Sequence, residues 1–159
     1  MTINEIKELL SHEPTAELIA ELAQDKRVAV QKLLQSYHKR IEKAALEKER
    51  FYKMLSYERQ YYGEGAKLIA GVDEAGRGPL AGPLVIAAVI LPEDVFISGL
   101  NDSKQISASK RDKLYDEVLQ KAISVSVNIV SISNIDELNI YRATQKAMED
   151  LVSEFQHAD

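Results

Sequence analysis

Apolar residues recur at intervals of three and four through the first 62 residues of the chain. This spacing lines side chains along one face of a helix, so the whole segment is predicted to be helical. Thr2 or Asn4 would cap a short first helix, and Pro14 would lie in the first turn of a second. Asp25 would cap a third, long helix, which we expect to end at the glycines of residues 63–65.

The pattern changes at Lys67, where short apolar runs replace the helical repeat. Three runs have strand character, because they are apolar and rich in β-branched residues or alternate apolar with small polar residues: residues 68–73, 84–92 and 124–133. Helical spacing returns over residues 106–122, with Ser107 or Ser109 as cap, and again from Ile135, with a break near Asn139.

This order of elements predicts a mixed α/β or α+β domain with an all-helical N-terminal extension. We expect two parts, a helical extension at residues 1–65 and a sheet-containing domain at residues 66–159. The length of 159 residues suits one ordinary domain with such an appendage.

The composition excludes several classes of protein. The chain has no cysteine, so disulfides, Cys-ligated zinc and a thiol nucleophile are impossible. Its first residues lack the basic and then apolar layout of a signal peptide, and no apolar run is long enough to span a bilayer. We therefore expect a cytoplasmic protein with no membrane partner.

Charge is distributed unevenly, although the net charge is only −5. Residues 1–25 carry six acids and one base, residues 26–66 carry ten bases and five acids, and the remainder carries nine bases and fourteen acids. The basic middle segment has two interpretations, a local binding surface for a polyanion or a solvated helix face.

The strongest chemical candidate is the stretch that follows the first predicted strand. Asp73 and Glu74 can reach one site only if the strand ends or bulges between them, because successive side chains on a strand point to opposite faces. Two carboxylates without Cys or clustered His suit an oxygen-preferring cation such as Mg²⁺ or Mn²⁺. Arg77, between Gly76 and Gly78, offers a planar donor fork for phosphate. The alternative is a turn with a solvated acidic corner.

A second candidate lies in the predicted loop NDSK, residues 101–104. The Ser103 hydroxyl and the Lys104 ammonium could contact a phosphate, although a plain turn leading into the next helix is the competing interpretation. The three histidines lie far apart in the sequence, so no His-ligated metal is expected.

Three motifs resemble those of one known family, the type 2 ribonucleases H or ribonuclease HII family. They are GVDEAGRGPLAGPLVIAAVIL, GLNDSKQISASKRDKLYDEV and IDELNIYRATQKAM, and they occur in the family's order over about residues 66–155. The helical residues 1–65 resemble the extension that precedes the nuclease domain in some bacterial members.

The resemblance implies a ribonuclease H-like fold and a metal-dependent endonuclease. The substrate would be the RNA strand of an RNA–DNA hybrid, including single ribonucleotides in duplex DNA. Asp73 and Glu74 would be catalytic ligands of Mn²⁺ or Mg²⁺. Gly76, Arg77 and Gly78 would read the 2′-hydroxyl and phosphate at the ribonucleotide junction. Ser103 and Lys104 would contact the nucleic-acid backbone.

The family's site uses four carboxylates, and the resemblance places the other two on a later strand and helix. The sequence stops at Asp159, so we expect it to carry half of the metal site and to be weakly active or inactive. The alternatives are a non-catalytic nucleic-acid-binding remnant of the family and, less compatible with three ordered motifs, an unrelated phosphate-binding α/β module.

Overall fold

The structure is a computed structural model that describes residues 1–78 and 81–156. Its contacts divide the chain into two compact units, Met1–Lys53 and Met54–Asp159, which we describe separately. The division falls inside the segment predicted as one helical extension, and the expected boundary at residue 65 stays a prediction. None of the described helices combines the length and apolar character that crossing a bilayer requires.

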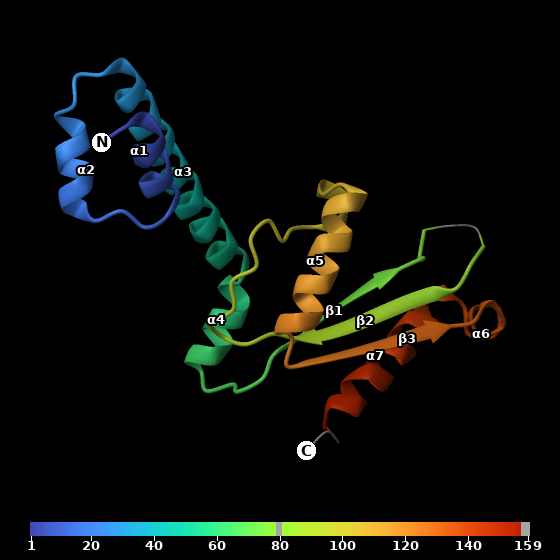
Figure 1. Cartoon of the computed structure of the whole chain (residues 1–159). Coiled ribbons are helices and arrows are strands. Elements are labelled where there is room, and N and C mark those ends of the chain that lie inside the picture. The colour runs from blue at the N-terminus through green and yellow to red at the C-terminus, as the bar shows by residue number, and fades with distance from the viewer. Residues whose placement is uncertain (79–80, 157–159) are drawn as a thin grey trace. The chain divides into compact units, whose positions relative to one another are not determined.

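The first unit is a small helical cluster of α1 (Ile3–Ser11), α2 (Ala16–Ala23) and most of α3 (Val28–Met54), coloured blue to teal in Figure 1. Its core contains the buried side chains at the predicted helical spacing, Ile6, Leu10, Leu22, Val30 and Leu34. The cap at Thr2 is confirmed: its hydroxyl accepts from the Glu5 N–H at 3.3 Å, and the Glu5 carboxylate accepts from the Thr2 N–H at 2.8 Å.

Two helix starts differ from the prediction. Pro14 does not lie in the first turn of α2, because Thr15 is the cap and accepts from the Leu18 N–H at 3.3 Å. The Asp25 carboxylate accepts from the N–H of Arg27 at 2.9 Å and binds its guanidinium, so the chain turns before α3 begins at Val28.

This turn gives the first unit a pH-dependent contribution to stability. Hydrogen bonds from the side chain and the backbone of Arg27 lower the pKa of Asp25 from 3.8 to about 2. Because the folded pKa is depressed, the stabilisation is complete above pH ~4 and is lost as the pH falls toward 2. We expect Asp25→Asn to lower the thermal midpoint at pH 6, with a difference from the unchanged protein that shrinks as the pH falls through about 2. A midpoint difference that does not change between these pH values would contradict this assignment.

The second unit begins with α4 (Ser56–Gly63), and here the prediction of one continuous long helix is wrong. Leu55, at φ −84° and ψ 23°, leaves the helical conformation between α3 and α4. The helical end at the glycines is confirmed, since α4 stops at Gly63 and Gly65 follows with φ +98°.

The sheet consists of β1 (Ala70–Ala75), β2 (Leu84–Ile90) and β3 (Ser124–Val130), paired antiparallel in that order. The predicted α/β class with a helical N-terminal region is confirmed. The third predicted strand was too long, because Ser131 caps α6 (Ile132–Leu138) by accepting from the Asn134 N–H. The predicted helix near residue 106 is α5 (Ala108–Lys121); Ser107 occupies its N-cap position, but its side chain forms no capping hydrogen bond with the described residues.

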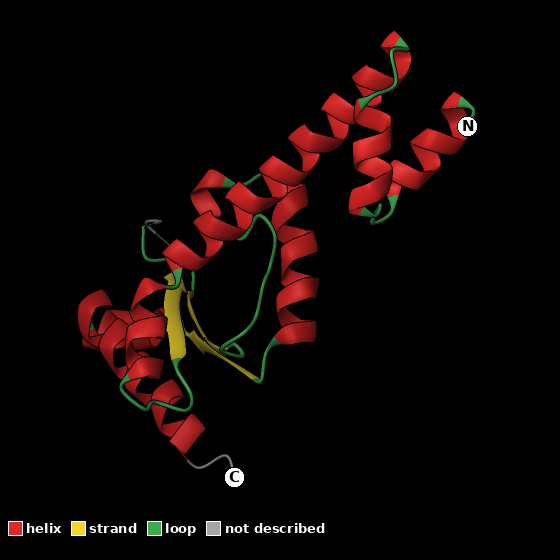
Figure 2. Ribbon diagram, turned by 90° about the vertical axis from the view of Figure 1, so that its left-hand side faces the viewer, coloured by secondary structure: helices red, strands yellow, loops and turns green. Residues whose placement is uncertain are grey.

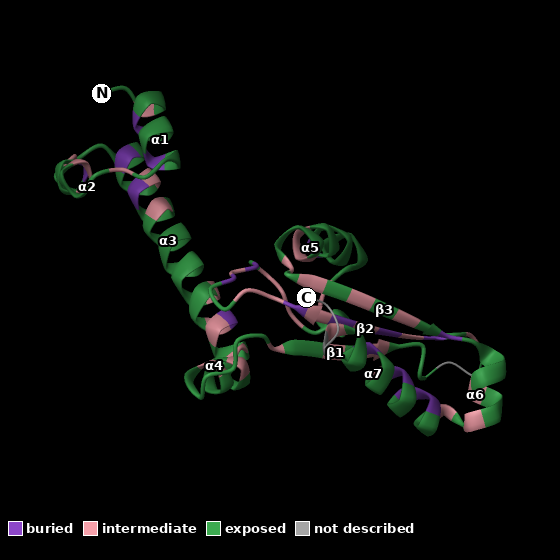
Figure 3. Ribbon diagram, turned by 90° about the horizontal axis from the view of Figure 1, so that it is seen from below, coloured by how far each residue is buried: buried purple, intermediate pink, exposed green. Residues whose placement is uncertain are grey.

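One face of the sheet is covered by α7 (Ile140–Gln156), and α5 lies on the other side (Figures 1 and 2). Alternate residues of β2 face α7 and are fully or almost fully buried, as the purple stretches in Figure 3 show. The core on this face comprises Leu84, Ile86, Ala88, Val130, Ala143, Ala147 and Leu151. This packing fixes which face each residue of β1 presents.

The predicted break between α6 and α7 is confirmed at Asn139, which has a left-handed φ of 65°. Its side-chain oxygen accepts from the N–H groups of Tyr141 and Arg142, both at 3.1 Å, and so caps the start of α7.

Replacement of Asn139 by alanine should therefore lose a cap and place a Cβ-bearing residue with no compensating side chain at a positive φ. We expect a loss of about 2 kcal/mol in the free energy of unfolding, measured by urea denaturation. Asn139→Gly removes the cap but tolerates the φ, so its loss should be about 1 kcal/mol or less. Equal losses for the two variants would show that the backbone conformation contributes nothing.

Candidate functional site

The predicted carboxylates both lie in β1, and the strand does not break between them. The register runs without interruption from Asp73 opposite Ala87 to Glu74 opposite Ile86 and Ala75 opposite Val85. The strand instead ends two residues later than the expected break, because the glycine-rich segment begins only after Ala75. Consecutive strand residues point to opposite faces, so the two side chains lie on opposite sides of the sheet.

Glu74 is on the face that α7 covers, beside the partly buried Val72. Its carboxylate forms an ion pair with Arg77, with 3.1 Å between Oε1 and Nη1. The Arg77 side chain keeps half of its surface exposed, and exposed ion pairs contribute at most about 1 kcal/mol. An incoming phosphate can therefore compete for this guanidinium at little cost.

Asp73 is exposed on the opposite face, where its row of the sheet continues through Ala87 and Val127. One carboxylate oxygen accepts from the N–H of Glu74 at 2.9 Å. The small and apolar neighbours in its row add neither charge nor a donor, and no described residue forms a hydrogen bond or ion pair with the second oxygen. The chemistry of this position suits a hard cation.

The two glycines around Arg77 have different structural roles. Gly76 has φ +89°, and a Cβ built on it would lie 2.4 Å from the carbonyl oxygen of Pro83, so no larger residue fits this conformation. Among the residues that the structure describes, none has an atom within 4 Å of a Cβ built on Gly78. The next residues of the motif, Pro79 and Leu80, lie outside the described residues.

The second predicted candidate forms a short 3₁₀ turn, Ser103–Gln105, that leads into α5. Asp102 caps this turn by accepting from the Lys104 N–H at 2.8 Å. The side chains of Ser103 and Lys104 are exposed. Both earlier interpretations thus describe part of the observation: the segment is a helix lead-in, and it presents a hydroxyl and an ammonium to solvent.

Arg111 is a supporting residue that the sequence did not reveal. From the first turns of α5 its guanidinium donates to the carbonyl oxygens of Ser103 and Ile106, at 2.9 Å each. These bonds hold the turn that carries Ser103 and Lys104. Asp102 also stabilises this turn, and the sequence does indicate it, because an Asp two residues before a helical N–H is a typical cap.

The structure joins some of the predicted residues and leaves others apart. Glu74 and Arg77 are bonded, Asp73 is adjacent but faces the other way, and no bond between described residues links this hairpin to Ser103 or Lys104. Within residues 1–78 and 81–156, no group of three or more Asp, Glu or His side chains is placed to hold a metal ion.

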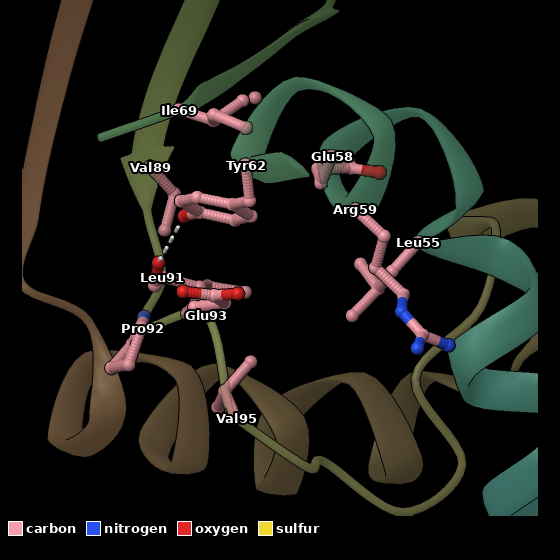
Figure 4. A pocket seen from close by; sticks show the side chains of 11 residues that line it. Leu55, Glu58, Arg59, Tyr62, Ile69, Val89, Leu91, Pro92, Glu93 and Val95 are labelled. Carbon is pink, nitrogen blue, oxygen red and sulfur yellow. Dashed lines mark hydrogen bonds between the residues drawn. The ribbon is translucent and has the colours of Figure 1, made fainter. Parts of the chain in front are cut away.

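A cavity of the second unit lies elsewhere, between α4, the start of β1 and the end of β2 (Figure 4). It measures about 130 Å³, and none of the predicted site residues lines it. The Tyr62 hydroxyl donates to the Leu91 carbonyl at 3.4 Å, and burial, with Glu93 and Glu58 nearby, raises the pKa of this hydroxyl. Among the described residues, one carboxylate oxygen of Glu58 is buried without a hydrogen-bond partner. The walls are otherwise mostly apolar.

The fold and the β1–β2 hairpin together define an α/β protein whose first strand carries adjacent carboxylates and is followed by a glycine-framed arginine, a set suited to cations and phosphates. Family models match both parts of the chain: that of the ribonuclease HII N-terminal domain at residues 2–62 and that of ribonuclease HII at residues 70–157. The chain belongs to the ribonuclease HII family.

Curated relatives agree with this assignment. The chain is 49% identical over 152 residues to a ribonuclease HII of Ligilactobacillus salivarius and 51% identical over 148 residues to one of Bacillus cereus. These alignments cover 96% and 93% of this chain but 60% and 57% of the relatives, so the chain spans about three fifths of their length. A crystal structure of ribonuclease H2 from Pyrococcus horikoshii matches 45% of this chain and 36% of its own, at 38% identity and a TM-score of 0.39.

Proposed function

We propose that the chain acts as a metal-dependent endonuclease that hydrolyses the RNA strand of RNA–DNA hybrids, including single ribonucleotides in duplex DNA. The observation that carries the proposal is the hairpin of a ribonuclease HII family member, in which an open Asp73 carboxylate and a half-exposed Arg77 flank one strand end. A cytoplasmic location is part of this proposal.

Asp73 and Glu74 are the residues that would hold Mn²⁺ or Mg²⁺. These cations prefer carboxylate oxygens as ligands. One oxygen of Asp73 accepts from the Glu74 N–H, and the other does not take part in this bond. A bound cation would supply an activated water and neutralise charge on the phosphate. Because the two side chains face opposite sides and Glu74 is paired with Arg77, we expect weak metal affinity and slow cleavage for this chain.

Recognition of the ribonucleotide would fall to the backbone and side chain of Gly76-Arg77-Gly78. Gly76 brings the chain close to Pro83 and sets the direction of the segment, while the open space at Gly78 lets a sugar approach its backbone. The 2′-hydroxyl is the group that distinguishes RNA from DNA at such a site. Ser103 and Lys104 would contact backbone phosphates from their turn.

The test is incubation of the chain with a labelled DNA duplex that contains one ribonucleotide, with Mn²⁺ or Mg²⁺, and with an all-DNA duplex as control. We expect slow cleavage beside the ribonucleotide, no cleavage of the control and no cleavage after chelation of the metal. Cleavage that ignores the ribonucleotide or persists with the chelator would contradict the proposal.

A second function is favoured by one observation, the lack of a third metal-capable side chain near Asp73 and Glu74 among the described residues. In this alternative the chain binds duplexes without cutting them. Binding of the ribonucleotide duplex without any cleavage in either metal would select this alternative.

A further inference from the structure

Charge is segregated within the first unit in a way that the proposed nuclease site does not use. Residues 1–25, which include α1 and α2, hold six acids and one base, whereas α3 (Val28–Met54) holds seven bases and three acids. Both sets belong to one small helical cluster. The first unit therefore has separated charges, with the basic residues of α3 as its positive part.

Three of these bases share one side of α3. Lys32, Lys39 and Lys43 are separated by seven and four residues, which at 100° per residue confines them to a sector of roughly 40°. The buried core residues Val30 and Leu34 fall roughly 180° away on the same helix. We call these three residues the α3 lysine stripe, which extends over about 16 Å of helix.

The lysines of the stripe are exposed, and their charges are not neutralised by ion pairs with described residues. None of the ion pairs seen in the described ranges involves them: Arg27 pairs with Asp25, and Arg50, on the same side further along α3, pairs with Glu47. The remaining acids of α3, Glu42 and Glu49, lie roughly 80° or more from the centre of the stripe. A regular anion array would therefore meet three uncompensated positive charges.

We propose that the α3 lysine stripe binds the sugar–phosphate backbone of a nucleic-acid duplex without regard to base sequence or sugar type. A duplex carries closely spaced charges in a line, to which lysines on a straight helix are complementary. A membrane surface fits less well, because the apolar core residues of the unit are buried, and the exposed Ile41 and Leu46 of α3 lie on different sides of the helix and form no continuous face for insertion. This inference depends on the proposed function in one respect, namely that the partner is a nucleic acid.

The test measures binding of the full chain to an all-DNA duplex of about 20 base pairs by fluorescence anisotropy over a salt series, so that cleavage plays no part. The stripe variant is Lys32→Gln, Lys39→Gln and Lys43→Gln together. The matched control is Lys7→Gln, Lys26→Gln and Lys48→Gln, which removes the same charge from exposed positions of the same unit.

We expect the stripe variant to bind at least tenfold more weakly at low salt and to reduce the slope of log affinity against log salt by roughly 2 to 3. The control variant should keep the slope of the unchanged chain, and three Lys→Arg changes in the stripe should restore binding. Circular dichroism should show the same helix content for all variants, since the replaced residues are exposed.

Equal slopes for the stripe variant and the unchanged chain would overturn the proposal, as would equal losses in the stripe and control variants. Loss of binding to polyglutamate or to phosphatidylglycerol vesicles, with duplex binding unchanged, would overturn it in favour of an acidic protein or a membrane. This test is independent of the nuclease proposal, because that proposal is tested by cleavage beside a ribonucleotide, and the duplex used here contains no ribonucleotide.

Discussion

Replacement of Asp73 by asparagine is expected to lower metal-dependent cleavage of a ribonucleotide-containing duplex by about 100-fold or more, which corresponds to about 2.7 kcal/mol of transition-state stabilisation. The substitution keeps the shape of the side chain but removes the charge that would hold the cation. Asparagine retains the oxygen that accepts from the Glu74 N–H, so the strand should keep its conformation. Duplex binding should therefore survive, and only the cleavage rate should fall.

Asp112→Asn provides the control for charge, because Asp112 is an exposed acid on α5, outside the proposed site. Both variants lose one negative charge, and only Asp73→Asn should lose activity. Isothermal titration with Mn²⁺ supplies a second measurement, in which Asp73→Asn should show a weaker association than Asp112→Asn. Equal cleavage by Asp73→Asn and the unchanged chain would show that the site has been assigned to the wrong residue.

Replacement of Gly76 by alanine should have the largest effect on stability of any single change in the hairpin. We expect a loss of about 2–4 kcal/mol in the free energy of unfolding of the second unit, measured by urea denaturation. Two costs combine: an L-residue at φ +89°, about 1–2 kcal/mol, and a Cβ placed 2.4 Å from the Pro83 oxygen. The backbone must move at the end of β1, next to Glu74 and Arg77, so substrate binding should weaken as well.

Gly78→Ala is the matched control, because it lies two residues away in the same segment and its Cβ would contact no atom of the described residues within 4 Å. Its free energy of unfolding should stay within about 0.5 kcal/mol of the unchanged chain. If Gly78→Ala nevertheless weakens binding of the ribonucleotide duplex, the open space there is needed for the substrate. Similar stability of the two variants would mean that the close approach of Gly76 to Pro83 is not a constraint.

The sequence by itself determined the features that depend on a few neighbouring residues. The capping box of Thr2 and Glu5, the break at Asn139 and the helix end at Gly63 were all predicted correctly, because each is formed by hydrogen bonds or backbone preferences within about four residues. The continuous apolar, β-branched-rich run of residues 84–92 likewise predicted the strand β2.

The tertiary structure decided the features that need a distant partner. The ladder with β2 carries β1 on to Ala75, and this register sends Asp73 and Glu74 to opposite faces, contrary to the predicted break. The bonds from Arg111 to the Ser103 turn span five to eight residues and depend on how the chain enters α5.

The chemistry of the candidate site was therefore visible in the sequence, while its geometry was not. Residue type alone shows that two carboxylates, a guanidinium and flexible glycines occur together, since these properties belong to the side chains themselves. The directions in which they point are set by strand pairing and by the packing of α7, which link residues far apart in the chain. Local patterns carry no record of those pairings, so only the folded structure separates Asp73 on the open face from Glu74 beside Arg77.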